Sequence, residues 1–252
     1  MEIVLLTALG IGSATVIGAL LGFVFKRISH SFSDAVISFA AGVMMCAAII
    51  GLILPSLNSP NEYSILITVT GIFLGAIILN IIDRLVPHLH RMVGKDIESH
   101  KHGTDGINKT MLFVLAIAIH NFPEGIAAGV GFGSGNNADA LTVAGGIALQ
   151  NIPEGMVIIA PMLAAGITKR KTFLIAAGTG LIEVIGTMLG YFAVSFSTVI
   201  LPFALAFAGG TMLYIISDEM IPETHSHGNE RSSTYALLFG FCLMLAVDFY
   251  LG

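Results

Sequence analysis

This chain of 252 residues contains very little charge, because only 11% of its residues are charged whereas 55% are hydrophobic. Soluble domains carry about a quarter charged residues, so the charge present here is too low to cover a water-soluble globule. The mean hydropathy of +0.90 agrees with that exclusion. Tryptophan is absent, and the only two cysteines, Cys46 and Cys242, lie within apolar runs, which argues against a disulfide framework. The composition therefore predicts an integral membrane protein.

Eight apolar segments with few or no charges run along the chain, and each is long enough for a helix to cross about 30 Å of hydrocarbon. They are residues 2–25, 34–57, 63–86, 110–132, 138–163, 172–196, 200–221 and 233–251. Since they account for most of the sequence, we expect one all-α transmembrane domain over residues 1–252 and no sizeable soluble domain. The longest connection, residues 87–109, is polar and contains several histidines.

Basic residues are missing from every second connection between these segments. All 11 Lys and Arg residues fall in or beside the first, third, fifth and seventh connections, and none falls in the second, fourth or sixth. Lys and Arg are retained on the cytosolic side of membranes. This alternation predicts that both termini face outside and that the 87–109 connection is a cytosolic loop.

Two polar motifs interrupt the apolar segments, HNFPEG at residues 120–125 and QNIPEG at residues 150–155. In each motif three polar side chains share one helical face: His120, Asn121 and Glu124, and then Gln150, Asn151 and Glu154. Each proline removes an amide donor and leaves a carbonyl oxygen four residues earlier without its usual partner. Consecutive spans run antiparallel, so the two copies should face each other across a pseudo-two-fold axis, as in transporters with inverted repeats. Three spans on either side would give a 3+2+3 arrangement.

The most deeply placed ionisable residues are one histidine and three glutamates: His120, Glu124, Glu154 and Glu183. A charged side chain at the bilayer centre costs at least about 2.5–3.5 kcal/mol, and no basic residue lies at the same depth. The carboxylates must therefore either hold protons or surround a cation. One imidazole with carboxylates and amide oxygens, and without a thiolate, suits a divalent ion such as Zn²⁺, with Fe²⁺, Mn²⁺ or Cd²⁺ as alternatives.

Small residues flank these polar positions. They are Ala176, Thr179, Gly180, Gly186, Thr187 and Gly190 around Glu183, and Ala116, Ala127, Ala128 and Gly131 around His120. Small residues let helices approach closely, so these faces belong in the interior of a bundle and not against lipid. Met44, in the second segment, is either a soft metal ligand or a packing residue.

A second group of histidines and acids lies at the expected cytosolic ends of the third and seventh segments. It comprises Asp83, His88, His90, Asp218, Glu219, Glu223, His225 and His227. Two interpretations stay open for this group. Its members are either solvated loop residues or an exit or sensing site that takes metal from the pore.

With these residues in view, the chain resembles the ZIP (Zrt/Irt-like) family of metal transporters, particularly its bacterial and GufA-like members. The likeness depends on HNFPEG, QNIPEG, Glu183 and the stretch SFAAGVMM in the second segment, and it covers essentially the whole chain. The resemblance implies ATP-independent uptake of divalent metal ions into the cytosol, by an elevator-like alternating-access movement of one helix group against another. It also implies a bacterial cytoplasmic membrane as the location.

The resemblance further implies particular ligands. The transport site would use His120, Glu124, Gln150 and Glu154, with Met44 as a further ligand. An adjoining second site would use Asn121, Glu124, Asn151, Glu154 and Glu183, and the cytosolic metal residues would be Asp83, His88, His90, Asp218, Glu219 and His225. Many relatives have His in place of Gln150, and some have Asp in place of Asn151. The chain therefore carries one weaker ligand and one negative charge fewer than those relatives.

Two other functions fit parts of the pattern. A transporter of protons or monovalent cations would use protonated glutamates. An intramembrane metallohydrolase would need an H-E-x-x-H helix, whereas residues 120–124 read H-N-x-x-E. We therefore expect a protein that is not an enzyme, whose metal is cargo and not a catalytic cofactor. Its expected partners are the metal ion and the lipid bilayer, with a homodimer as the assembly to test and no role for nucleic acid.

Overall fold

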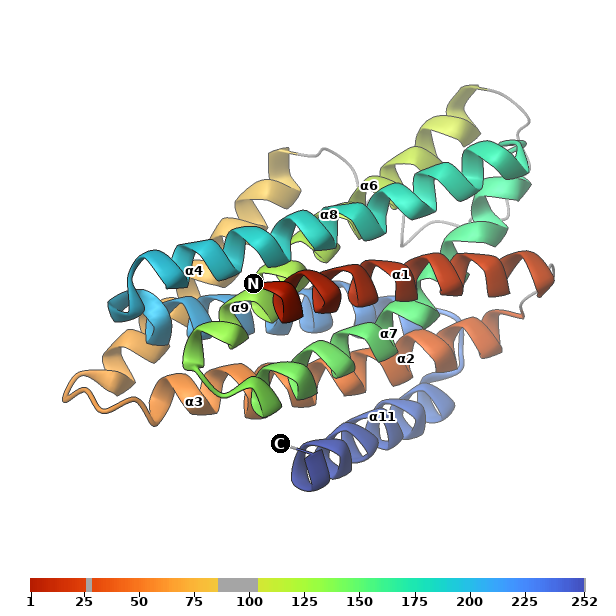
Figure 1. Ribbon diagram of the computed structural model, residues 1–252. Coiled ribbons are helices and arrows are strands. Elements are labelled where there is room, and N and C mark those ends of the chain that lie inside the picture. The colour runs from red at the N-terminus through yellow and green to blue at the C-terminus, as the bar shows by residue number, and fades with distance from the viewer. Residues whose placement is uncertain (26–28, 86–103, 252) are drawn as a thin grey trace.

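The computed structural model describes residues 1–25, 29–85 and 104–251, and every regular element within these ranges is helical. The long helices are α1 (Glu2–Val24), α2 (His30–Cys46), α4 (Ser64–Leu85), α6 (Thr104–Gly131), α7 (Asn137–Ala164), α8 (Lys169–Phe196), α9 (Leu201–Ile215) and α11 (Glu230–Leu251). The short ones are η1 (Ala47–Ile53), α3 (Leu54–Leu57), η2 (Phe132–Ser134), η3 (Thr198–Ile200), η4 (Ile216–Met220) and α10 (Ile221–Thr224). Figure 1 shows the long helices lying lengthwise beside one another, with α11 at the edge of the molecule.

Several helices, α2, α6, α8 and α11 most clearly, begin earlier than the apolar segments that predicted them. The α8 helix starts at Lys169, whereas its apolar segment starts at residue 172, and α6 starts at Thr104, within the connection expected over 87–109. Backbone hydrogen bonding does not stop where the apolar residues stop, because polar side chains form helix equally well in water. Hydropathy therefore located the helices well and their N-terminal ends less well.

Seven helices in the described ranges are long and apolar enough to cross a membrane. They correspond to seven of the eight expected segments. The remaining segment is α6, which has 28 residues and is not one of these seven, so the count of eight spans stays a prediction. The least buried of the seven are the spans of α4 and α11, with 22% and 11% of their apolar windows buried. Their outer faces are placed to contact lipid.

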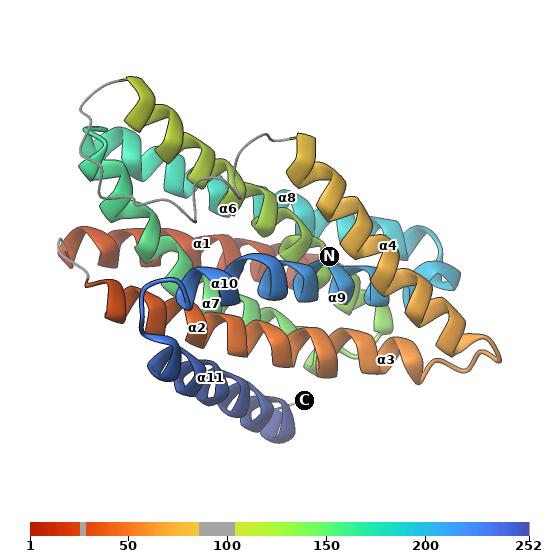
Figure 2. The same ribbon diagram turned by 180° about the vertical axis from the view of Figure 1, so that it is seen from behind.

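The helices divide into two groups by their contacts. In the first group α6 packs along α8, α7 packs along α1, and α1 also packs on α8. In the second group α11 packs along α2 and α4 packs along α9, while η1 and α3, which continue α2, also contact α9. The groups meet where α2 contacts α7 and where α9 contacts α6. Figure 2 shows α9 and α10 running between α1 and α2.

Glycines allow the backbones of the first group to approach closely. A β-carbon on Gly125 would overlap the backbone of Glu183, and a β-carbon on Gly155 would overlap the backbone at Thr15. These two glycines end the two PEG sequences, so each motif is pressed against a different neighbouring helix. Of the small residues expected at helix contacts, Gly186 and Gly190 of α8 meet the backbone of α6 at Phe122 and Ile126.

Two π-helical segments, η1 and η4, interrupt the long helices of the second group. A short α-helix follows each of them, α3 after η1 and α10 after η4. The second residue of each short helix is a proline, Pro55 in α3 and Pro222 in α10. A π-helical turn contains one extra residue and is frequently found at functional sites. The η4 segment includes Asp218 and Glu219, so it brings two acids toward the contact between the helix groups.

Candidate metal centre

A cluster of fully buried polar side chains lies within the first helix group. Its members are Thr15 on α1, Asn121 and Glu124 on α6, Gln150 and Asn151 on α7, and Glu183 on α8, each with an exposed fraction of 0%. Buried polar groups are normally paired with one another. The pairing here is uneven, because one side of the cluster is saturated with hydrogen bonds and the other has none.

Glu183 is the saturated side. Its Oε1 atom accepts a hydrogen bond of 2.9 Å from the Thr15 hydroxyl and one of 2.5 Å from the Asn121 amide. Its Oε2 atom accepts a short hydrogen bond from the Asn151 amide. One carboxylate on α8 therefore receives donors from α1, α6 and α7, which ties the four helices of the first group together.

The hydrogen bonds to Glu183 fix how the two asparagines are turned. An amide has one NH₂ and one oxygen, so donation by Nδ2 of Asn121 and Asn151 directs their Oδ1 atoms away from Glu183. Those two Oδ1 atoms, both carboxylate oxygens of Glu124 and both amide atoms of Gln150 are buried and have no partner within hydrogen-bond geometry among the described residues, although the Gln150 amide lies near enough to Glu124 to interact with its carboxylate. Five buried oxygens without donors would cost about 1–3 kcal/mol each if nothing bound to them.

Helix geometry explains why these groups meet. Pro123 and Pro153 lie inside α6 and α7, as the two motifs predicted. Each proline leaves a backbone carbonyl without its usual donor, so it adds polarity near the motif. The charges of Glu124, Glu154 and Glu183 are close enough to interact with one another. These three carboxylates therefore lie near one another, and their common depth in the membrane stays a prediction.

His120 contacts a residue that the sequence places in the predicted cytosolic group. Its Nε2 atom lies 2.8 Å from Oε1 of Glu219 on η4, and the two side chains are 13% and 16% exposed. The charges of His120 and Glu154 also interact, and Glu154 is only partly buried. His120, Glu154 and Glu219 thus form a more exposed edge of the centre, and the His120–Glu219 contact joins the two helix groups.

Met44 is fully buried near the end of α2. It belongs to the main apolar core together with Ala127 and Ile147. Ala127 follows Glu124 by one turn of α6, and Ile147 precedes Gln150 by one turn of α7. Met44 is thus part of the apolar core that also contains residues one turn from Glu124 and from Gln150, and both of its predicted roles stay open.

The donor set of the centre decides what it can bind. Among the described residues, no three His, Cys, Asp or Glu side chains are grouped so that they could hold a metal ion by themselves. The five oxygens without donors come from one carboxylate and three amides, and oxygen ligands of this kind suit divalent cations. A cation at this position would satisfy atoms that are otherwise unpaired, so the residues fit a divalent ion held largely by oxygen.

The residues of the predicted cytosolic group have separate partners in this structure. Glu219 contacts His120, while His225 bonds through Nδ1 to the Ile221 carbonyl at 2.8 Å. His88, His90 and the side chain of Asp83 lie outside the described residues, so a shared site with Asp218 stays a prediction. Glu219 was predicted to belong to the exit group, whereas the structure places it beside His120 at the edge of the centre.

Sequence reasoning missed two polar residues that the structure makes important. Thr15 is a partner of Glu183, and its signal was a spacing, because the pattern G-x₂-T-x₂-G-x₃-G from Gly12 to Gly22 repeats as G-x₂-E-x₂-G-x₃-G from Gly180 to Gly190. Asp34, at the start of α2, is 2% exposed. It accepts hydrogen bonds from His227 at 3.0 Å and Asn229 at 2.9 Å, which fastens the α10–α11 turn to α2.

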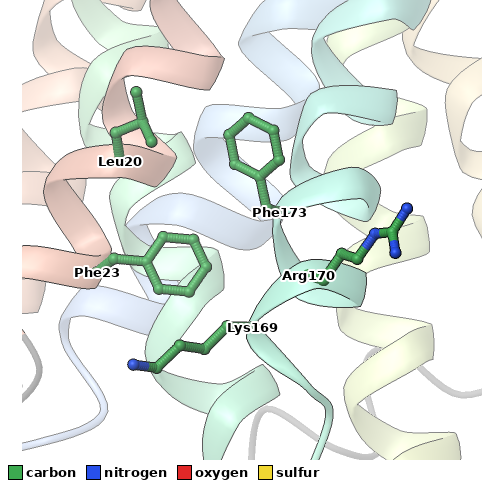
Figure 3. Close-up of a pocket in the computed structure, with 5 residues that line it drawn as sticks. All are labelled: Leu20, Phe23, Lys169, Arg170 and Phe173. Atoms are coloured by element: carbon green, nitrogen blue, oxygen red, sulfur yellow. The ribbon is translucent and has the colours of Figure 1, made fainter.

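A shallow hollow of about 420 Å³ lies away from the centre, between the end of α1 and the start of α8. Figure 3 shows Phe23 and Phe173 projecting into this space while Arg170 points away from it. Lys169 and Leu20 complete its lining. None of these residues belongs to the buried polar cluster, so this hollow is not part of the candidate ion site.

The long apolar helices around a buried, oxygen-rich polar centre define a polytopic integral membrane protein with a candidate cation site. Residues 94–248 match the family model described as ZIP Zinc transporter. The chain is 37% identical over 254 residues to zinc transporter GufA of Myxococcus xanthus, with 98% of each chain covered. It is 34% identical to zinc transporter ZIPB of Bordetella bronchiseptica, covering 95% of this chain and 78% of the relative. It is also 32% identical to zinc transporter ZupT of Chlorobaculum parvum, covering 92% and 91%. The chain belongs to the ZIP family, as its motifs predicted.

Proposed function

We propose that this protein transports divalent metal ions across the membrane without ATP, with Zn²⁺ as the leading cargo and Cd²⁺, Fe²⁺ and Mn²⁺ as further ions. The observation that carries this proposal is the set of five buried oxygens without donors on Asn121, Glu124, Gln150 and Asn151. Such a set has no stabilising role in an apolar core unless a cation visits it. The relatives named as zinc transporters support zinc as the first ion to test.

The ion site is proposed to consist of Glu124, Gln150 and Glu154, with His120 at its exposed edge and Met44 as a soft ligand. His120 Nε2 and Glu219 Oε1 are 2.8 Å apart, so an ion at that edge would replace their hydrogen bond. Glu219 is then the first acidic group that the ion meets on the second helix group. Mixed oxygen and nitrogen ligands without a thiolate allow the ion to be released, because they bind Zn²⁺ less tightly than cysteine does.

The division into two helix groups supports transport by alternating access. The other residues of the proposed site are on α6 and α7, while Met44 and Glu219 come from α2 and η4 in the other group. We infer that the first group slides against the second and changes which side of the membrane reaches His120 and Glu154. Uptake toward the cytosol, both termini outside and a bacterial cytoplasmic membrane follow from the distribution of Lys and Arg together with the family resemblance.

An inverted 3+2+3 repeat accounts for the helix contacts. The packing of α1 on α7 has its counterpart in α8 on α6, and that of α2 on α11 in α9 on α4. The glycine contacts agree, because Gly18 faces Ile152 of α7 while Gly186 faces Phe122 of α6. We infer a pseudo-two-fold axis that relates α1, α2 and α4 to α8, α9 and α11 and passes between the two PEG motifs.

The proposal is tested with purified protein in liposomes that enclose a zinc-sensitive fluorophore. External Zn²⁺ should produce a saturable signal without ATP, and Cd²⁺, Fe²⁺ and Mn²⁺ should compete in a measurable order. Flux that persists in a strong chelator and follows pH alone would instead indicate a transporter of protons or monovalent cations. Metal-dependent cleavage of a membrane peptide without ion flux would indicate a hydrolase.

A further inference from the structure

The hollow between the end of α1 and the start of α8 has apolar walls. They are formed by Leu20 and Phe23 of α1, by Phe173 of α8 and by the side-chain stem of Lys169 (Figure 3). Phe23 also packs against a buried apolar cluster that contains Ile159, which supports its ring at the wall. The volume of about 420 Å³ lies within the range of about 300–1,000 Å³ that is usual for small-molecule sites. The hollow therefore has the size and the lining for an apolar chain.

Three consecutive basic residues, Lys169, Arg170 and Lys171, begin α8 next to this hollow. All three side chains are exposed, and none of them forms an ion pair with another described residue. Figure 3 shows the amino group of Lys169 on the same side as Phe23, while Arg170 points the other way. Three cations without a protein carboxylate form a positive rim around an apolar space, so the complementary ligand is an amphiphile with a negative head.

The order of these groups along the helices matches the order of groups in a phospholipid. Lys169 is the first residue of α8, and Phe173 follows it by four residues, or about 6 Å, toward the middle of the helix. On α1 the chain ends its helix at Val24, so Leu20 lies deeper than Phe23. The cations are thus at the helix end, which the Lys and Arg distribution predicts to be cytosolic, and the apolar walls extend inward. Basic pockets between transmembrane helices on the cytoplasmic side bind anionic headgroups.

We propose that this hollow binds one anionic phospholipid of the cytoplasmic leaflet, with an acyl chain against Phe23 and Phe173 and with its phosphate beside the basic residues that begin α8. The N–H groups of the first turn of α8 lie at the same end, and their cap residue, Thr168, makes no side-chain hydrogen bond to them. No residue of the ion centre takes part, so the inference does not depend on the proposed metal transport. Both walls belong to the first helix group, so the lipid is held by that group alone.

The absence of tryptophan makes a site-specific test possible. Phe173→Trp places the only tryptophan of the chain in the wall of the hollow. The full-length protein is reconstituted in mixtures of phosphatidylglycerol and phosphatidylcholine, and bromine on the acyl chains of one or the other lipid quenches the fluorophore that it contacts. Quenching should show a preference for phosphatidylglycerol of about fivefold or more, the effect of one basic residue near an anionic lipid.

A matched reporter on the same helix separates this site from ordinary lipid contact. Phe192 is also on α8, is 50% exposed and does not line the hollow, so Phe192→Trp should report a preference below about twofold. An equal preference at the two reporters would overturn the proposal. Should Phe173→Trp fail to assemble, as judged by gel filtration, Phe23→Trp reports from the opposite wall.

The basic residues are tested in the Phe173→Trp background. Lys169→Gln combined with Arg170→Gln should lower the preference to the value found with Phe192→Trp, because the rim then lacks its two lining cations. Arg231 is an exposed cation on the same expected side of the membrane at the start of α11, and Arg231→Gln should leave the preference unchanged. A preference that survives the double substitution, or that falls equally with Arg231→Gln, would mean that no local site selects the lipid.

Two further conditions identify the ligand. Inorganic phosphate, compared with chloride at equal ionic strength, should not relieve the quenching by brominated phosphatidylglycerol, because the hollow binds the acyl chain as well as the head. Relief by phosphate would overturn the assignment to a lipid. The preference should also persist in excess metal chelator, and a preference that disappeared there would overturn a lipid site independent of metal. Failure of zinc flux, in contrast, would leave this result untouched.

Discussion

The two copies of the polar motif are alike in backbone and opposite in surroundings. On α6 the carboxylate of Glu124 is fully buried while the imidazole of His120 reaches the exposed edge. On α7 the amide of Gln150 is fully buried while the carboxylate of Glu154 is partly exposed. The antiparallel direction of the two helices causes this reversal, since the first residue of one motif lies level with the fifth residue of the other.

The comparison shows that the centre has a dry half and a wetter half. Glu124, Gln150 and the two asparagines form the dry half, and His120, Glu154 and Glu219 form the wetter one. An ion that enters from the wetter half can exchange its water ligands for protein ligands one after another. Two motifs of nearly the same sequence can therefore act at two successive stages of ion entry. The motifs differ in which of their residues are buried, and this difference separates the two stages.

The largest effect is expected from removing either carboxylate. Glu124→Ala and Glu154→Ala should abolish Zn²⁺ and Cd²⁺ uptake into liposomes, because each removes a charged ligand of the proposed ion site. The exposed loop residue Glu62 provides the matched control, and Glu62→Ala should keep wild-type flux. Normal flux in either motif variant would show that its glutamate is not part of the ion pathway. The two motifs would then not act as two parts of one site.

The glycine of the α7 motif should be the next most sensitive position. Gly155→Ala would push its methyl group against the Thr15 backbone, and overpacking of this kind usually costs about 1–3 kcal/mol. Gly145 lies on the same helix with nothing near its missing β-carbon, so Gly145→Ala serves as the control. Thermal unfolding in detergent should show a lower midpoint for Gly155→Ala alone. Equal midpoints for the two variants would contradict the close approach of α7 and α1.

Adding a charge to the dry half should change its ion count. Asn151→Asp removes the amide donor to Glu183 and introduces a second carboxylate, so a further Cd²⁺ ion should bind beside the first. Titration calorimetry measures the count, and Asn151→Gln, which adds no charge, is the control. An unchanged count in Asn151→Asp would exclude an adjoining second site at this position.

The smallest effect is expected from matching the first residues of the two motifs. Gln150→His adds a second imidazole to the centre, on the side of Glu124, and should shift selectivity toward Zn²⁺ over Mn²⁺ by a few fold, since imidazole suits Zn²⁺ better than Mn²⁺. Competition uptake assays report this ratio directly, with Gln150→Asn as the variant that keeps an amide. A ratio that stays at the wild-type value would mean that Gln150 does not contact the ion.

The sequence predicted most of the fold because lipid imposes simple rules. Apolar length located the long helices, and the cost of a charge at depth selected Glu124, Glu154 and Glu183 before any contact was known. Small residues correctly marked the faces on which α6 meets α8. These features depend on one residue at a time, or on neighbours within one helix, and so they can be predicted from composition and spacing.

Partnerships between distant helices could not be predicted in the same way. The pairing of His120 with Glu219 joins residues 99 positions apart, and that of Thr15 with Glu183 joins residues 168 apart. Each depends on how two helices are rotated about their axes, which hydropathy does not determine. Thr15 is also uncharged, so it carries no cost at depth that would draw attention to it. Only the repeated glycine spacing on α1 and α8 provided a signal.

Gly12 and Gly180 have no side chain that could bind an ion, but they set the distance between α1 and α8. The separation of α1 and α8 at their contact decides how far the Thr15 hydroxyl stands from Glu183, which is 2.9 Å. Hydrogen bonds are essentially lost beyond about 3.5 Å, so a small widening at this contact would remove the Thr15 bond to Glu183 while the donors on α6 and α7 stayed in place. The spacing set by two glycines therefore controls a polar contact that neither of them makes.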